Sequence, residues 1–238
     1  MKISYSILIL GSEGQLGREF RKLCSVYSSC KFSFVSRKEL DLTNEQEIID
    51  FFIKNNFDIV INCTAYTQVD KAEDEKELAK LINCDAIKIM AEVLEKKDTA
   101  FIHYSTDFIF DGERENPYKE TDNPNPKNYY GKTKLLGEQE IIKVGLKGII
   151  LRTSWLYSNY GNNFLKTILE LSKKKKQIKV IDDQKGSPTY ARDLAEVTMK
   201  LIELNNQSQL FKKTQILNYC NKGEVSWCEF AKEIVSQA

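Results

Sequence analysis

Near the N-terminus an apolar run leads directly into a glycine-rich turn: Ser6-Ile7-Leu8-Ile9-Leu10-Gly11-Ser12-Glu13-Gly14-Gln15-Leu16-Gly17. The run predicts a strand over 6–10, and the spacing G-x-x-G-x-x-G predicts a tight turn that opens a helix. Glycines there let the backbone approach a pyrophosphate, while the free N–H groups at the helix start carry partial positive charge. Gly17 would let the helix pack closely on the sheet. We therefore expect a dinucleotide-phosphate site; the alternative is a turn without a ligand.

The alternation of strand and helix continues along the whole chain. Short apolar runs predict strands at 32–35, 58–63, 100–104, 148–152, 178–181 and 216–217. Amphipathic stretches predict helices at 15–25, 44–55, 70–97, 126–144, 162–174, 191–204 and from 226 onward. Such alternation gives parallel strands joined by right-handed crossovers. The expected fold class is α/β, a doubly wound parallel Rossmann-like sheet, with residues 1–160 as an NAD(P)-binding domain and residues 161–238 completing the sheet and forming a small substrate lobe.

Composition narrows the classes of partner. The formal net charge is +1, with 35 basic against 34 acidic residues, so no overall field would recruit nucleic acid or an anionic membrane. No apolar run is long enough for a transmembrane helix. The six cysteines include no C-x-x-C pair, which indicates reduced thiols in a cytoplasmic protein. Because the chain has one histidine, a histidine-based metal centre is not expected.

The end of the second strand bears on the choice of cofactor. NAD-specific sites usually place an acidic residue here for the ribose hydroxyls. This chain has Ser36, Arg37 and Lys38 instead. A cation suits a 2′-phosphate, so we expect NADPH to be preferred, with NADH as the second choice. An exposed basic turn without a ligand is the alternative.

A Y-x-x-x-K motif lies in the fourth predicted helix, 126–144, which Asn125 and Pro126 are expected to start. Positions i and i+4 share one helix face, so Tyr130 and Lys134 should form a pair. An ammonium group beside a phenol stabilises the phenolate and lowers its pKa. Tyr130 could then donate a proton to a carbonyl oxygen, and Lys134 could also hold the nicotinamide ribose. The motif alone is common by chance in a lysine-rich chain.

The fourth strand supplies a hydroxyl group. Side chains alternate along a strand, so Tyr104 and Thr106 share one face, and His103 and Ser105 the other. Thr106 lies at the carboxyl end, where open α/β sheets bind ligands, and could hydrogen-bond a substrate carbonyl. His103 points away from Thr106 and is interpreted as a core histidine.

At this point the chain resembles a known family, the extended short-chain dehydrogenases, and within them the dTDP-4-dehydrorhamnose reductases. The resemblance rests on stretches that follow the family's order over nearly the whole sequence. They are 11–17, 40–43 (LDLT), 62–73 (NCTAYTQVDKAE), 105–112 (STDFIFDG), 130–134, 136–138 (LGE), 152–157 (RTSWLY), 163–164 and 183–189 (DQKGSPT).

The resemblance implies reduction of the 4-keto group of a dTDP-deoxysugar by NAD(P)H, with a sugar nucleotide as the substrate partner. It implies a catalytic set of Thr106, Tyr130 and Lys134, and substrate contacts at Thr106, Asp107 and Trp155. Together with the glycine turn and the basic residue after strand two, the expected cofactor contacts are Gly11, Gly14, Gln15, Leu16, Gly17, Arg37, Asp41, Leu42, Thr64, Ala65, Tyr66, Tyr104, Tyr130 and Lys134. For Trp155, core packing is an equal alternative.

Two departures from the family pattern and two rival interpretations stay open. Family members continue beyond the stretch that ends at Ala231, so the substrate lobe is expected to be reduced or truncated. Some relatives bind magnesium at a dimer contact through acidic residues, but Arg192 lies where an acid would be needed, so no metal is expected; a homodimer remains a candidate assembly. The rivals are another nucleotide-sugar reductase or epimerase, and a non-catalytic NADP-binding subunit similar to the methionine adenosyltransferase β subunit.

Overall fold

A six-stranded sheet forms the centre of the molecule in the computed structural model, which describes residues 4–208 and 210–238. All paired neighbours in this sheet are parallel. The order is β2-β1-β3-β4-β5-β9, so the winding direction reverses at β1 and β3. Ligands of open α/β sheets bind at such a switch point, outside the carboxyl ends of the strands. The strands are β1 (Ser6–Leu10), β2 (Lys31–Val35), β3 (Ile59–Asn62), β4 (Ala100–Thr106), β5 (Gly148–Thr153) and β9 (Thr214–Asn218).

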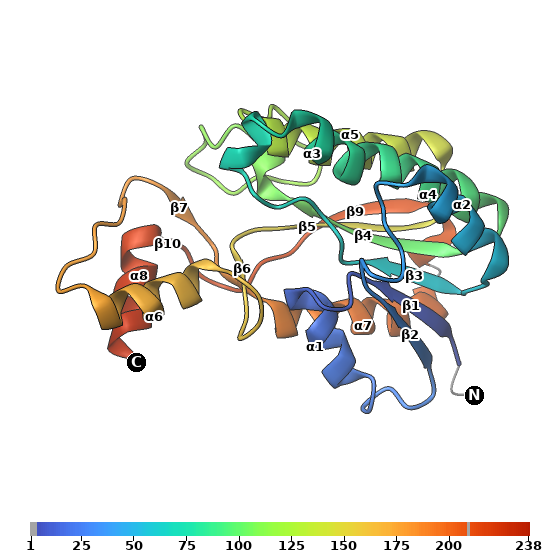
Figure 1. Ribbon diagram of the computed structural model, residues 1–238, viewed down its shortest axis with the longest axis horizontal. Helices are drawn as coiled ribbons and strands as arrows, with labels where there is room; N and C mark the ends of the chain where they lie inside the picture. The colour runs from blue at the N-terminus through green and yellow to red at the C-terminus, as the bar shows by residue number, and fades with distance from the viewer. Residues whose placement is uncertain (1–3, 209) are drawn as a thin grey trace.

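Helices cover both faces of the sheet (Figure 1). One face packs against α1 (Gln15–Leu23) and α7 (Ala191–Ser208), and it includes Ile7 and Ile9. The other face, with Leu8 and Leu10, packs against α2 (Glu45–Lys54), α4 (Ala86–Lys96) and α5 (Tyr129–Val144). Successive side chains of a strand point to opposite faces, so a run that is apolar at every position is buried on both. The predicted doubly wound α/β sheet is confirmed.

The start of α5 differs from the prediction. The helix begins at Tyr129, and its N-cap is Asn128, whose side chain accepts a hydrogen bond from Gly131 N at 2.7 Å. Asn125 is held elsewhere: its backbone N–H donates to Ile109 O at 2.8 Å, and its side-chain amide donates to Asp111 at 3.0 Å. The assignment of Asn125 and Pro126 as the helix start was wrong. Tertiary contacts hold this segment as a loop, and the helix begins only after Asn128, which is its N-cap.

The predicted long helix over 70–97 is divided into pieces. A 3₁₀ turn (Asp70–Glu73) is followed by α3 (Lys76–Lys80), a π-helical turn (Leu81–Asp85) and then α4. Asn83 lies in the π turn, fully buried, and its amide bonds both backbone groups of Tyr66 and the hydroxyl of Thr133. The wider turn therefore lets a polar side chain tie the loop after β3 to α5, in keeping with the frequent occurrence of π turns near functional sites.

The C-terminal lobe stands at one end of the sheet (Figure 1). It pairs α6 (Phe164–Lys174) with α8 (Trp227–Ser236), and β7 (Lys185–Gly186) lies antiparallel to β10 (Val225–Ser226). A second two-stranded ribbon, β6 (Leu156–Tyr157) with β8 (Thr189–Tyr190), joins the lobe to the sheet. A capping box on Ser226 and Glu229 starts α8.

The strand predicted at 178–181 was wrong, because this segment forms no strand and its apolar residues pack on helices instead. Ile178 and Val180 contact the small core between α6 and α8, while Ile181 is half exposed. The strand predicted near 216–217 is confirmed as β9, the last strand of the main sheet. Among the described helices, none combines the length and apolar character that crossing a bilayer would need.

Candidate active site

The glycine turn between β1 and α1 is built from backbone in close contact. Gly11 has φ +73°, a left-handed conformation that glycine adopts without strain. A Cβ atom on Gly17 would lie 2.3 Å from Gly11 O, so α1 can approach the turn only because Gly17 has no side chain. Gly14 is the N-cap of α1 and supplies no side-chain cap, which leaves the N–H groups of the first turn available to an anion.

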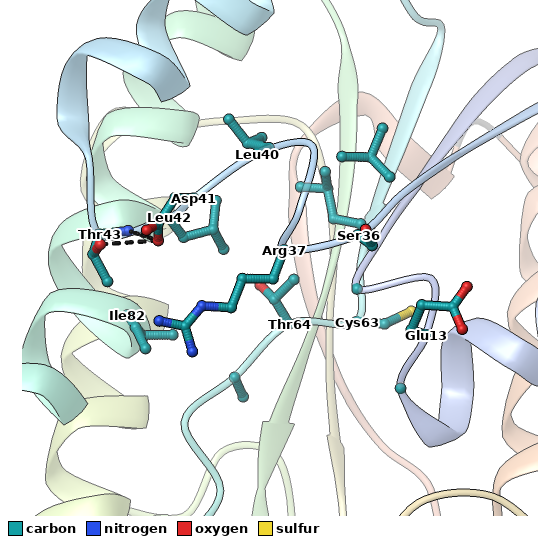
Figure 2. Close-up of a pocket in the computed structure, with 15 residues that line it drawn as sticks. Glu13, Ser36, Arg37, Leu40, Asp41, Leu42, Thr43, Cys63, Thr64 and Ile82 are labelled. Atoms are coloured by element: carbon teal, nitrogen blue, oxygen red, sulfur yellow. Dashed lines mark hydrogen bonds between the residues drawn. The ribbon is translucent and has the colours of Figure 1, made fainter.

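A pocket of about 270 Å³ opens beside this turn at the carboxyl ends of β1, β2 and β3. Seven predicted cofactor residues share its wall although they come from four separate segments. Figure 2 shows Arg37 reaching across the pocket from the end of β2. The seven are Gly11, Gly14, Arg37, Asp41, Leu42, Thr64 and Ala65.

Asp41 is fixed on one side of this pocket. Its carboxylate accepts hydrogen bonds from the backbone N–H and the hydroxyl of Thr43, at 3.0 and 2.9 Å (Figure 2). These bonds, the backbone one first, and the nearby Arg37 lower the pKa of Asp41. A held carboxylate suits a ribose hydroxyl or an adenine amine, and the exposed Arg37 suits a phosphate. Glycine turn, carboxylate and cation together fit an adenine dinucleotide.

Thr106 and Tyr130 meet at the carboxyl end of β4. A short 3₁₀ turn, η3 (Asp107–Ile109), follows the strand, and Thr106 caps it by accepting a hydrogen bond from Phe108 N at 3.2 Å. Helix α5 packs tightly on η3, and the contact requires glycine at position 131: a Cβ atom there would lie 2.1 Å from Phe108 O. The same approach sets the Tyr130 ring edge-on against Phe108, with ring centroids 5.8 Å apart, and places it near Thr106. The side chains of Thr106 and Tyr130, which were predicted to act together, therefore lie close to each other.

Lys134 lies one turn further along α5 and is 1% exposed. Its Nζ donates to Tyr104 O at 2.6 Å and contacts His103 Nε2 at 3.1 Å. Burial lowers the pKa of Lys134 to about 8. The predicted i, i+4 spacing is present, but the amine faces β4, where it contacts Tyr104 O and His103 Nε2.

The expected lowering of the Tyr130 pKa was wrong. Burial raises this pKa to about 12, and the hydrogen bond with Thr106 offsets only part of the rise. The reason is geometric: the Lys134 amine is committed to β4, so it does not compensate the loss of water around the phenol. Burial likewise raises the pKa of the neighbouring Asp107 carboxyl to about 6.

Other residues predicted to contact cofactor hold the frame around the pocket. Gln15 Oε1 accepts hydrogen bonds from Ser158 and Asn163, which links α1 to the start of the C-terminal lobe. The Tyr66 hydroxyl donates to Glu75 at 2.7 Å. Leu16 is buried in the core, and the Tyr104 hydroxyl bonds Thr198 on α7 at 2.7 Å. Their assignment as cofactor contacts stays a prediction.

Trp155 stands between the sheet and the lobe. Its ring stacks on Trp227 of α8 with centroids 3.5 Å apart, and Gly186 lies against the same ring. Its φ of +45° is unusual for a bulky residue. The structure thus shows the Trp155 ring packed against residues of the C-terminal lobe, and its contact with substrate stays a prediction.

Two polar residues next to the site were missed by the sequence analysis. Asn62 ends β3 and lies opposite His103 in the β3–β4 register, with its amide 3.1 Å from His103 Nδ1. His103 is fully buried, as expected for a core histidine, and its Nε2 also lies 3.1 Å from the Lys134 amine, a contact that the sequence analysis did not predict. The available signal was the occurrence of polar residues at the ends of two neighbouring apolar strands.

A reversal of sheet order beside a glycine-rich turn, with a tyrosine and a lysine brought to the same edge, defines the class of short-chain dehydrogenases and reductases with a Rossmann-like sheet. The family described as RmlD substrate binding domain matches residues 5–238. The chain belongs to this family.

Individual relatives agree over nearly the full chain. It is 39% identical over 235 residues to dTDP-4-dehydrorhamnose reductase of Aggregatibacter actinomycetemcomitans, which covers 98% of this chain and 79% of that protein. It is 35% identical to the spore coat polysaccharide biosynthesis protein SpsK of Bacillus subtilis, with 98% and 79% covered. A crystal structure of the Bacillus anthracis dTDP-4-dehydrorhamnose reductase in complex with NADP superposes with a TM-score of 0.91 at 37% identity, over 99% of this chain and 81% of that one.

Proposed function

We propose that this chain is an NADPH-dependent oxidoreductase that reduces the 4-keto group of dTDP-4-dehydrorhamnose to give dTDP-L-rhamnose, within polysaccharide biosynthesis. The observation that carries the proposal is the meeting of β4 and α5 at the carboxyl edge of the sheet, where Thr106 ends the strand and Tyr130 packs on Phe108, two residues after Thr106. The names of the relatives support the substrate class. The proposed substrate contacts are Thr106, Asp107 and Trp155.

The proposed mechanism assigns each residue one task. NADPH, when bound, supplies a hydride to the carbonyl carbon. Tyr130 donates its phenolic proton to the carbonyl oxygen as that oxygen gains negative charge, and Thr106 orients both the phenol and the oxygen by hydrogen bonding. A neutral phenol suits reduction, because the proton donor must carry its proton before hydride transfer. Burial raises the pKa of Tyr130 to about 12 and so keeps the phenol protonated. Lys134 provides positive charge once it holds a proton.

The preference for NADPH rests on the end of β2. Arg37 is exposed and lines the pocket, and a guanidinium can bind a phosphate with two hydrogen bonds. Glu39, the acid nearest this strand end, accepts a hydrogen bond from Ser36 N at 2.7 Å and is not among the residues that line the pocket. Two acidic residues, Glu13 and Asp41, line the pocket; Asp41, held by Thr43, could bind ribose hydroxyls, which leaves room for NADH as the second cofactor.

The decisive experiment is turnover. Purified protein is mixed with NADPH and dTDP-4-dehydrorhamnose, the absorbance of NADPH is followed, and the sugar product is identified by NMR; Tyr130→Phe serves as the matched control. We expect oxidation of NADPH with formation of dTDP-L-rhamnose, lost in the variant. Turnover only with another keto sugar would replace the substrate assignment. NADPH binding without turnover of any keto sugar would favour the non-catalytic subunit instead.

Assembly and location are part of the same proposal. A homodimer is proposed from the resemblance, and sedimentation of the purified protein tests it. A cytoplasmic location is supported by the cysteines, all six of which are free. Labelling of accessible thiols in intact cells with an impermeant reagent tests that location, since cytoplasmic protein should stay unlabelled.

A further inference from the structure

The first residue of α1 connects the glycine turn to the C-terminal lobe. Gln15 follows the N-cap Gly14, so its backbone belongs to the turn proposed to hold the cofactor phosphates. Its side-chain Oε1 accepts hydrogen bonds from Asn163 Nδ2 at 2.7 Å and from the Ser158 hydroxyl at 3.2 Å. Both donors lie between β6 and α6, 148 and 143 positions further along the chain. Gln15 therefore has its backbone in the candidate cofactor site and its side chain on the segment that starts the lobe.

Asn163 makes this contact on the side of the lobe. Its Oδ1 accepts a hydrogen bond from Lys166 N at 3.1 Å and so caps α6, which identifies the other end of the amide as the NH₂ group. That NH₂ group faces Gln15 Oε1, and it also lies 2.8 and 3.1 Å from the carbonyl oxygens of Ser158 and Tyr160. One side chain therefore caps the first helix of the lobe and holds α1 at the same time.

The segment between β6 and α6 packs closely on Gln15. Ser158 is 1% exposed, and its hydroxyl accepts a hydrogen bond from Tyr160 N at 3.0 Å. The single proton of this hydroxyl has two acceptors, Gln15 Oε1 at 3.2 Å and Tyr160 O at 3.1 Å, so the bond from Asn163 is the principal link. Gly161 has φ +62°, and a Cβ atom there would lie 3.0 Å from Gln15 Cγ. Neither Gln15 nor this segment has room to shift without the other.

A ligand at the glycine turn should restrict the lobe through this link. The first N–H groups of a helix have no partner within the helix, and a phosphate that accepts hydrogen bonds from them fixes the backbone that carries them. The Gln15 side chain is attached to that backbone and is bonded to the cap of α6. When one ligand has already ordered the link, a second ligand has less conformational entropy to lose, which gives positive cooperativity. Such coupling is reciprocal.

We propose that Asn163 is a positioning residue that acts through Gln15: it transmits occupancy of the glycine turn to α6, so that the nicotinamide cofactor and the sugar nucleotide each strengthen the binding of the other. The identity of the two ligands rests on the function proposed above. Asn163 needs no contact with either of them. The chain should therefore bind the sugar nucleotide more tightly when the cofactor is already in place.

Hydrogen–deuterium exchange tests the response of the lobe directly. Exchange of the backbone amides of α6 is followed by mass spectrometry with and without saturating NADPH. We expect NADPH to slow this exchange at least threefold in the unaltered protein and to leave it nearly unchanged in Asn163→Ser. Serine caps a helix about as well as asparagine does, but it has no NH₂ group for Gln15. The effect of NADPH is compared within each protein, which removes any difference in the stability of α6 itself.

Equilibrium binding measures the coupling between the two sites. Calorimetry gives the Kd of dTDP, which has no keto group to reduce, without cofactor and with saturating NADPH. We expect NADPH to lower this Kd about fivefold in the unaltered protein, which is at the weak end of ordinary coupling between sites, and to have almost no effect in Asn163→Ser. Asn162→Ser makes the same change at the exposed neighbouring position and should keep the full effect.

A second variant removes the link from its other end. Gln15→Met keeps the length of the side chain and the cap of α6 but has no amide oxygen for Asn163, so the response of α6 to NADPH should again be lost. This variant serves as the test if Asn163→Ser does not fold.

Two results would overturn the proposal. If NADPH binds the unaltered protein but exchange in α6 does not respond, occupancy of the turn is not transmitted. If Asn163→Ser and Gln15→Met respond as fully as the unaltered protein, the cofactor acts on the lobe by another route. Failure of the proposed function is distinguishable: a protein that binds NADPH and protects α6 but binds no dTDP keeps the link and loses the substrate assignment, whereas a protein that binds no NADPH loses both.

Discussion

The two halves of the sheet's carboxyl edge are built by different means. Between β1 and α1 the turn is held by close backbone contact, since a Cβ on Gly17 would overlap Gly11 O. At β4 and α5 the contacts are made by side chains, and those of Lys134 and Tyr130 are buried with shifted pKa values. The first half is determined by local conformation and the second by contacts between distant segments. Substitutions should therefore affect the two halves in different ways.

The largest expected effect is at the catalytic half. Tyr130→Phe removes the proton donor, and general acid catalysis contributes about 10²–10⁴ in rate, so kcat should fall by that factor. The dissociation constant of NADPH should stay the same, because the hydroxyl acts on the substrate. Steady-state kinetics and fluorescence titration measure the two quantities. Tyr129→Phe, on the same helix turn, is the control and should keep its activity; near-normal turnover in Tyr130→Phe would refute the assignment.

The glycine turn should respond in stability. Gly17→Ala places a methyl group against backbone, and overpacking of this kind costs about 1–3 kcal/mol in the free energy of unfolding. Gly14→Ala is the matched control, since its Cβ would lie 3.2 Å from Gly11 O at an extended φ of −73°. It should change stability by less while still weakening NADPH binding. Urea unfolding and cofactor titration compare the two; equal stability loss would show that the turn is not uniquely tight at Gly17.

Asp107 should make the catalytic half less stable at neutral pH. Its pKa is about 6 in the folded chain against an ordinary 3.8, so between these values the folded state binds more protons than the unfolded state. The free energy of unfolding then falls as pH rises through that window, by about 1.36 kcal/mol for each pKa unit. Asp107→Asn removes the carboxylate and should stabilise the protein by about 1–3 kcal/mol at pH 7 and by little at pH 4.

Urea unfolding at both pH values checks this prediction. Asp111→Asn gives the opposite sign as a control: hydrogen bonds, the one from Tyr118 first, lower the pKa of Asp111 to about 2, so its contribution is present at neutral pH and is lost in acid. A gain for Asp107→Asn that is the same at pH 4 and pH 7 would exclude titration as its cause.

The smallest expected effect concerns the choice of cofactor. Arg37→Ala should weaken NADPH binding roughly tenfold, about 1.4 kcal/mol, and leave NADH binding nearly unchanged. Calorimetry with both cofactors measures the difference. Lys38→Ala is the control, because Lys38 is exposed and is not among the residues lining the pocket. Equal weakening of both cofactors would show that Arg37 does not bind the 2′-phosphate.

The sequence analysis predicted the features that depend on local conformation and missed those that depend on contacts between distant segments. The strand, turn and helix over 6–17 are local, so their pattern was sufficient, and the hydroxyls of Thr106 and Tyr130 were found from strand and helix periodicity. The contact of His103 with Lys134 depends on β3–β4 register and on the depth of α5, which periodicity does not contain. The predicted start of α5 was wrong for a related reason. Asn125 and Asn128 can both cap a helix, and tertiary hydrogen bonds determine which of them does so.

The place of β9 in the chain has a consequence for folding kinetics. Gly148 pairs with Thr214, so the sixth strand docks only after the loop containing α6, β7, β8 and α7 has been closed. Closing a long loop before its contacts form slows folding, and strands that pair late leave an unpaired edge in the meantime. During synthesis on the ribosome, β5 therefore remains an open edge until residue 218 has emerged, and α8, which begins at Trp227, can fold onto α6 only after that.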